Sequence, residues 1–290
     1  MRLSVHHRTR YRFSRPIGGL IQLLRMTPQS STAQAVLDWR IDVDCDARVR
    51  EARDGYCNVT HMLYVNQPVT DLTITATGSV ITEDRAGVVE GLSGDLPPEI
   101  FMRSTPLTEP DEAIGELAAD ISGTGTPLDW LHALNRMVNK RMIFDTGSTH
   151  AQTTAASAWA AKRGVCQDFA HIFIAAARVS GVPARYISGH YYRRDGAGEQ
   201  SAGHAWVEAW VPDLGWVAFD PANGICADEA YIRIATGLDY SEAAPLAGAR
   251  RGGGEEEMTV DVSVAELRRR SQGQTQSQSG GGTQSQNQSQ

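Results

Sequence analysis

Three residues of this chain have the types and positions needed for nucleophilic catalysis. Cys166 comes directly before an apolar, helix-like segment, His204 follows a glycine where an alternating segment begins, and Asp220 ends the next such segment. Acyl transfer from an amide needs a nucleophile, a base that takes its proton and a group that orients the base. The N-terminus of a helix favours a thiolate there. We therefore predict a catalytic triad of Cys166, His204 and Asp220 that works through a thioester acyl-enzyme.

The hairpin that carries His204 and Asp220 puts a condition on this triad. Side chains along a strand alternate between the two faces of a sheet. With a two- or four-residue loop after Val211, His204 and Asp220 would point to opposite faces. We therefore predict an odd-length loop or a β-bulge here, since bulges often lie beside active sites.

The oxyanion that develops during acyl transfer needs hydrogen-bond donors. The backbone N–H of Cys166 is one candidate, and a second could come from the segment 146–159 or from Gln167. Asp168 is expected in the first helical turn, where its charge complements the helix dipole. His171 lies off the helical face of Cys166, so we expect it to pack inside the protein.

The surrounding segments indicate an α+β core with a central helix packed on an antiparallel sheet. Thr126 and Pro127 are typical of a helix N-terminus, and the apolar residues that follow them recur at helical spacing. The segment after Cys166 is apolar almost all round, which predicts a buried helix. Strands are expected later, over 186–192, 205–211 and 216–219. Helices followed by strands favour α+β over alternating βαβ units.

Alternation of apolar and polar residues predicts several strands in the first part of the chain. The pattern includes Leu37, Trp39, Ile41 and Val43, and its repetition suggests a β-sandwich. A similar alternation over 258–264 could return to this sheet.

These patterns divide the chain into five segments. We expect an N-terminal β domain, a connector with a short helix, a catalytic core, a returning strand, and a disordered tail rich in Gln, Ser and Gly, whose composition cannot repay the entropy of ordering. Their ranges are 1–85, 86–125, 126–248, 249–270 and 271–290.

Composition narrows the class of function. A formal net charge of −7 argues against a nucleic-acid partner, and we expect the N-terminal arginines to form the solvated face of a strand. The chain has no signal-peptide pattern and no apolar run near the ~18 residues of a membrane span, so we expect a cytoplasmic protein without a membrane partner. Four cysteines are too few for a disulfide scaffold, although a Cys45–Cys57 bridge stays open.

A metal site is the main chemical alternative to the triad. The candidate metal ligands are Cys166 with His171, or His190 with His204. The chain has no CxxC or HExxH motif, so we expect no metal and no cofactor.

Several motifs resemble those of bacterial transglutaminase-like proteins. The stretch 164–171 (GVCQDFAH) is similar to their nucleophile motif, and the N-terminal β region resembles the domain that precedes their core. At 237–240, Leu238 stands in place of the usual Arg of Gly-Arg-Asp-Tyr. The resemblance covers residues 1–264 and implies a papain-like core with the triad roles given above. Its other core motifs lie at 181–186, 187–189, 204–208, 215–217 and 219–223.

The resemblance leaves the reaction open, because such proteins include cross-linkers, peptidases, amidases and inactive members. We favour hydrolysis of amide bonds in a protein or peptide substrate, since water is the default acceptor and no feature indicates an amine site. One alternative is protein-glutamine gamma-glutamyltransferase cross-linking, in which the accessible glutamines of the tail could serve as acyl donors. The other is a non-enzymatic interaction module that retains the fold. The oligomeric state stays open.

Overall fold

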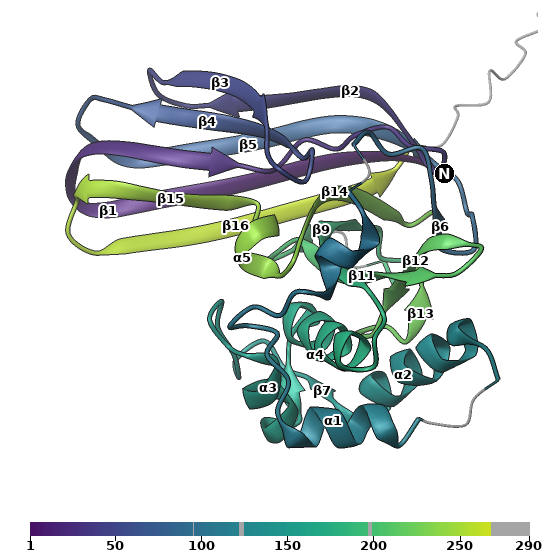
Figure 1. Ribbon diagram of the computed structural model, residues 1–290. Coiled ribbons are helices and arrows are strands. Elements are labelled where there is room, and N and C mark those ends of the chain that lie inside the picture. The colour runs from purple at the N-terminus through teal and green to yellow at the C-terminus, as the bar shows by residue number, and fades with distance from the viewer. Residues whose placement is uncertain (95, 122–124, 197–198, 268–290) are drawn as a thin grey trace, which may run out of the picture.

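The protein consists of a β region packed against a core of helices on a sheet (Figure 1). The computed structural model describes residues 1–94, 96–121, 125–196 and 199–267. The predicted tail 271–290 therefore lies outside the described residues. The order of helices and strands within the core confirms the predicted α+β class.

One long strand, β1 (Arg2–Leu24), organises the β region. Its first half pairs with β5 and β16, and its second half pairs with β4 and β15. The partners change around Pro16, which has no N–H to donate to a neighbouring strand. The other strands of the β region are β2 (Gln34–Val43), β3 (Arg48–Arg53), β4 (Val59–Val65), β5 (Val69–Thr82), β10 (Glu199–Gln200), β15 (Leu246–Gly252) and β16 (Glu256–Glu266).

The C-terminal strand β16 returns to β1, as the alternation predicts, and pairs with it from Leu3 to Phe13. Alternation alone was misleading in β2, where Leu37 is 46% exposed. The pairing of β2 with β5 shifts register between Val36 and Asp38. This irregularity changes the face to which Leu37 points, so sequence period two does not predict its burial.

The core sheet holds the strands on which the predicted histidine and aspartate lie. Its order is β13-β12-β11-β9-β14, with β6 paired to β12. All of its pairings are antiparallel. Its strands are β6 (Val88–Val89), β9 (Ala184–Tyr191), β11 (His204–Val211), β12 (Gly215–Asp220), β13 (Ile225–Cys226) and β14 (Tyr231–Gly237).

A buried helix, α4 (Cys166–Val179), packs on this sheet. Three further helices pack on the side of α4 that faces away from the sheet (Figure 1). The three are α1 (Glu112–Ala119), α2 (Pro127–Arg141) and α3 (Ala155–Ala161). Thr126 caps α2 as predicted, because its side chain accepts a hydrogen bond from the N–H of Asp129. The remaining elements are η1 (Pro98–Met102), α5 (Tyr240–Ala243) and the parallel pair β7 (Ile143–Phe144) and β8 (Arg163–Gly164).

The segment expected to be a connector also contributes to the core. Besides α1 it contains β6, which pairs with β12, and η1, which buries Phe101 against Trp216. A two-residue strand shows no periodicity, so β6 could not be predicted from the sequence.

A buried ion cluster joins three strands of the core sheet. Glu208 on β11 has no exposure and lies 2.6 Å from Arg185 on β9 and 2.8 Å from Arg233 on β14. A buried carboxylate requires such partners, because an unpaired charge in the interior is very costly. The cluster therefore fixes β14 relative to β11.

Surface charge is balanced on the outer face of β1. Arg8 lies 2.8 Å from Asp261, and Arg10 lies 3.1 Å from Asp71. These exposed pairs agree with a solvated strand face. Within the described ranges, none of the helices combines the length and hydropathy that crossing a membrane requires.

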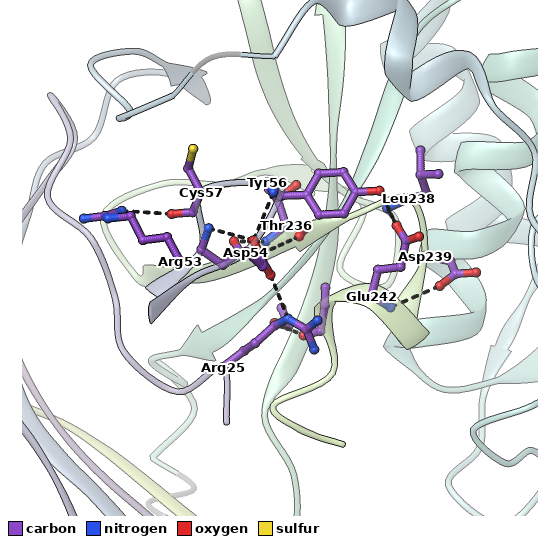
Figure 2. Close-up of polar contacts among 12 residues, drawn as sticks. Arg25, Arg53, Asp54, Tyr56, Cys57, Thr236, Leu238, Asp239 and Glu242 are labelled. Atoms are coloured by element: carbon purple, nitrogen blue, oxygen red, sulfur yellow. Dashed lines mark hydrogen bonds and ion pairs between the residues drawn. The ribbon is translucent and has the colours of Figure 1, made fainter. Parts of the chain in front are cut away.

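The turn between β3 and β4 joins the β region to β14 and α5 (Figure 2). Asn58 is buried and pairs with the backbone of Thr236, donating to its C=O at 2.8 Å and accepting from its N–H at 2.9 Å. Tyr56 donates its hydroxyl proton to Glu242. Asp54 accepts from Arg25 at 3.0 Å, so the turn is held on both sides.

A second contact between the two parts is a buried pair of histidines. The rings of His7 on β1 and His190 on β9 pack edge to face with 5.3 Å between their centroids. Burial, followed by the charge of His6, lowers the pKa of His7 to about 4. Burial also lowers the pKa of His190 well below its ordinary value. Both rings are therefore neutral at pH 7.

The contact of Asn58 with Thr236 is expected to contribute measurably to the free energy of unfolding. Asn58→Ala removes three side-chain hydrogen bonds, one to Asp54 and two to Thr236, and leaves buried backbone groups of Thr236 without these partners. The free energy of unfolding should therefore fall by about 2–4 kcal/mol. Urea unfolding measures this. The exposed Asn66 gives the control, since Asn66→Ala should change the value by less than about 0.5 kcal/mol. Equal effects of the two substitutions would contradict the proposed contribution of the Asn58 contact to stability.

The histidine contact should make the protein sensitive to acid. His7 titrates at about 4 in the folded protein against 6.5 when unfolded, so the unfolded state takes up the proton first. Stability should therefore fall as the pH drops from 6.5 to about 4. His7→Gln should flatten this dependence in unfolding experiments, while His6→Gln removes only the smaller cause of the shift and should flatten it less. A wild-type slope in His7→Gln would show that His7 is not responsible.

Candidate active site

The helix that carries Cys166 begins in a closed, capped turn. Asp168 accepts a hydrogen bond from the N–H of Val165 at 2.8 Å and from the hydroxyl of Thr149 at 2.7 Å. Burial raises the pKa of Asp168, and these hydrogen bonds oppose the rise. Asp168 thus does more than complement the helix dipole, since it ties the first turn to the loop before α3.

Gly164 is required by this turn. A Cβ at position 164 would lie 2.6 Å from Oδ2 of Asp168, which is closer than any side-chain carbon can approach. The glycine two residues before Cys166 therefore allows Asp168 to cap the helix and fixes where the thiol begins.

The predicted odd-length loop in the hairpin is confirmed. Val211 pairs with Gly215 and Val207 with Phe219, which leaves the three residues 212–214 as the loop. In this register His204 and Asp220 share one face of the sheet. Nε2 of His204 lies 2.6 Å from Oδ2 of Asp220.

The charge of Asp220 controls the titration of His204. Burial alone would lower the pKa of the ring, but the Asp220 carboxylate, its hydrogen bond and the contact with Cys166 outweigh burial and raise the pKa to about 10. Burial works in the opposite sense on Asp220, yet His204 and the other donors lower the pKa of that carboxyl. The pair is therefore an imidazolium and a carboxylate at neutral pH.

Cys166 lies beside the same ring. Its proximity contributes to the raised pKa of His204. Since Asp220 takes Nε2, Nδ1 is the ring nitrogen that remains for the sulfur. The structure thus brings together all three residues of the predicted triad, with the ring between sulfur and carboxylate.

The other cysteines differ from Cys166 in their surroundings. All four are free thiols, so the structure contains no Cys45–Cys57 bridge. Burial raises the pKa of Cys226 to about 11, and burial with the nearby Asp44 raises the pKa of Cys45.

Sequence reasoning missed two residues that hold Asp220. Tyr231 donates its hydroxyl proton to Oδ2 at 2.7 Å, and the Asn223 amide donates to the same oxygen at 2.7 Å. The N–H groups of Ala222 and Asn223 bind Oδ1 at 2.9 and 3.1 Å. The spacing of Asp220 and Asn223 could have indicated a turn around the carboxylate. Tyr231 gives no local signal.

The remaining candidates have structural partners. Gln167 donates to the C=O of Ala151 at 3.2 Å, so the second oxyanion donor stays unassigned. His171 is buried as expected and accepts the N–H of Tyr240 at 3.1 Å. No cluster of three or more His, Cys, Asp or Glu side chains suited to a metal ion occurs in the part of the chain that the structure describes.

Comparison with known proteins gives the family. Residues 115–221 match the model of the Transglutaminase-like superfamily, and residues 3–81 match that of the Bacterial transglutaminase-like N-terminal region. An uncharacterised protein of Mycobacterium tuberculosis is 30% identical over 289 residues, which cover 91% of each chain. The chain therefore belongs to the transglutaminase-like superfamily.

Two further proteins are similar to this chain. The structure of a candidate cysteine protease from Cytophaga hutchinsonii has a TM-score of 0.76 and 21% identity, and covers 92% of this chain and 91% of that one. This likeness confirms the transglutaminase-like fold. A protein-glutamine gamma-glutamyltransferase of Pseudomonas aeruginosa is 30% identical over 113 residues, which are 37% of this chain and 15% of that protein.

Removing the charge of Asp220 should reverse the titration of His204. In Asp220→Asn the burial that lowers the pKa of His204 is no longer offset by the carboxylate charge, so this pKa should fall from about 10 to below 6.5. NMR of the histidine rings measures this, with the signal assigned from its loss in His204→Gln. Asp213→Asn, in the exposed hairpin loop, should leave the pKa unchanged. An unaltered titration in Asp220→Asn would exclude Asp220 as the controlling group.

Proposed function

We propose that this protein is a cysteine-dependent enzyme that hydrolyses amide bonds of a protein or peptide substrate through a thioester at Cys166. The observation that carries the proposal is the largely buried His204 ring, which lies beside Cys166 and forms a hydrogen bond with Asp220. A ring held as imidazolium beside a sulfur stabilises a thiolate, which is the attacking form of cysteine.

The chemistry follows from this arrangement. The Cys166 sulfur attacks the carbonyl carbon, and the C–S bond forms as the carbonyl electrons move to oxygen. The tetrahedral species collapses, the C–N bond breaks, and Nδ1 of His204 gives its proton to the leaving amine. The ring then takes a proton from water, which attacks the thioester and releases the acid and the thiolate. Asp220 stays ionised and holds the ring throughout.

Cross-linking is the second candidate, and it shares every step up to the thioester. An amine would then replace water as the acceptor. The similarity of part of this chain to a protein-glutamine gamma-glutamyltransferase supports this alternative. We favour water, because none of the contacts described around Cys166 marks a site for an amine.

A non-enzymatic role fits the site less well. A module without activity has no need of an ion pair beside a thiol, and the burial of the Asp220 carboxylate costs free energy. Asp220 has 0% exposure and His204 has 12%. Cytoplasmic location and the lack of a nucleic-acid partner remain predictions from the sequence.

Mass spectrometry of a peptide library would test the proposal and separate the two reactions. The wild type should cleave amide bonds in ¹⁸O-water and incorporate the isotope into the new acid, whereas cross-linking would attach an added primary amine to glutamine. Cys166→Ala should lower either rate by about 10³-fold or more. Cys226→Ala removes a thiol outside the triad and should keep the activity.

The reactivity of the thiol gives an outcome that does not depend on the substrate. Iodoacetamide at pH 6–7 should label Cys166 faster than Cys226, whose pKa of about 11 keeps it protonated. Equal labelling of the two cysteines, together with no activity on any peptide, would favour the non-enzymatic role.

A further inference from the structure

Tyr231 binds the same oxygen of Asp220 that binds the catalytic ring. Its hydroxyl lies 2.7 Å from Oδ2, and Nε2 of His204 lies 2.6 Å from that atom. Asn223 is the third side-chain donor, at 2.7 Å. Three donors on one carboxylate oxygen compete for its negative charge, so the strength of each hydrogen bond depends on the other two.

The phenol is a permanent donor in this arrangement. Burial, followed by the charge of Asp220, raises the pKa of Tyr231 far above its ordinary value, so the hydroxyl keeps its proton. The Asn223 amide lies 3.4 Å from the phenol oxygen and donates to it. The phenol proton is therefore directed to Asp220.

Packing fixes the ring that carries this hydroxyl. Tyr231 contacts Tyr191 with 4.7 Å between centroids and meets Trp206 edge to face at 5.3 Å. Its centroid is 6.0 Å from that of His204. The ring is 6% exposed, so the hydroxyl has little freedom to leave the carboxylate.

The titratable groups that face His204 come from four elements. Cys166 lies at the start of α4, Asp220 at the end of β12, Tyr191 at the end of β9 and Tyr231 at the start of β14. Of the tyrosines, Tyr231 forms a hydrogen bond with Asp220 among the described residues.

We propose that Tyr231 is a positioning residue that aligns Asp220 with the His204 ring and moderates the basicity of that ring. This inference rests on the proposed function for its catalytic meaning. The hydroxyl spreads the charge of Oδ2, which keeps Asp220 from drawing the proton off the imidazolium. The positive end of the O–H dipole also weakens the attraction between the Asp220 carboxylate and the imidazolium, so Nδ1 releases its own proton more readily to a leaving amine.

Histidine NMR in a Cys166→Ser background tests the inference without any substrate. Tyr231→Phe keeps the ring and removes the hydroxyl, so the pKa of His204 should rise by about 0.5 units, the size expected for one lost neutral hydrogen bond. Asn223→Ala removes the other side-chain donor and should shift the pKa in the same direction. Tyr192→Phe is the matched control, because Tyr192 packs on the same apolar cluster as Tyr231.

The possible outcomes are distinct. A purely structural role of Tyr231 predicts lower stability with an unchanged pKa of His204, and that result would overturn the inference. If Tyr231→Phe fails to fold, Asn223→Ala still decides, because an unchanged pKa there would show that donors on Oδ2 do not act on the ring. A shifted pKa in a protein whose wild-type Cys166 is inert would keep the inference and reject the proposed function.

Discussion

The site depends on one buried carboxylate. Asp220 has no exposure, and it accepts five hydrogen bonds among the described residues. A charge in the interior is stable only when its partners are complete, because desolvation costs more than a single ion pair returns. The surrounding chain therefore has to bring donors from three places, namely β11, the turn after β12, and β14.

The nucleophile belongs to a second rigid unit, the helix α4, which packs on the core sheet. Helix α4 is buried from Asp168 to Arg178, and Asp168 and Gly164 close its first turn. Because neither the helix nor the sheet can shift without breaking core packing, the distance between the Cys166 sulfur and the His204 ring is set by how the two units dock. This is preorganisation, in which groups stand in place before the substrate binds.

The sequence predicted the parts of this arrangement that local patterns encode. The apolar run after Cys166 indicated α4, the Thr126 cap indicated α2, and the parity of the hairpin required an odd-length loop or a bulge. It could not predict what arises between distant segments. The register shift in β2 exposes Leu37, β6 is too short to show a period, and Tyr231 reaches Asp220 from a strand at the sheet edge.

The position of β14 gives the β region a role in the chemistry. One end of β14 carries Tyr231, which binds Asp220, and the other end carries Thr236, which pairs with Asn58 of the β region. On the adjacent strand β9, His190 packs on His7. The β region thus holds the outer edge of the core sheet in register. Without that support, β14 would be a free edge strand, and the hydroxyl that binds Asp220 would lose its fixed place.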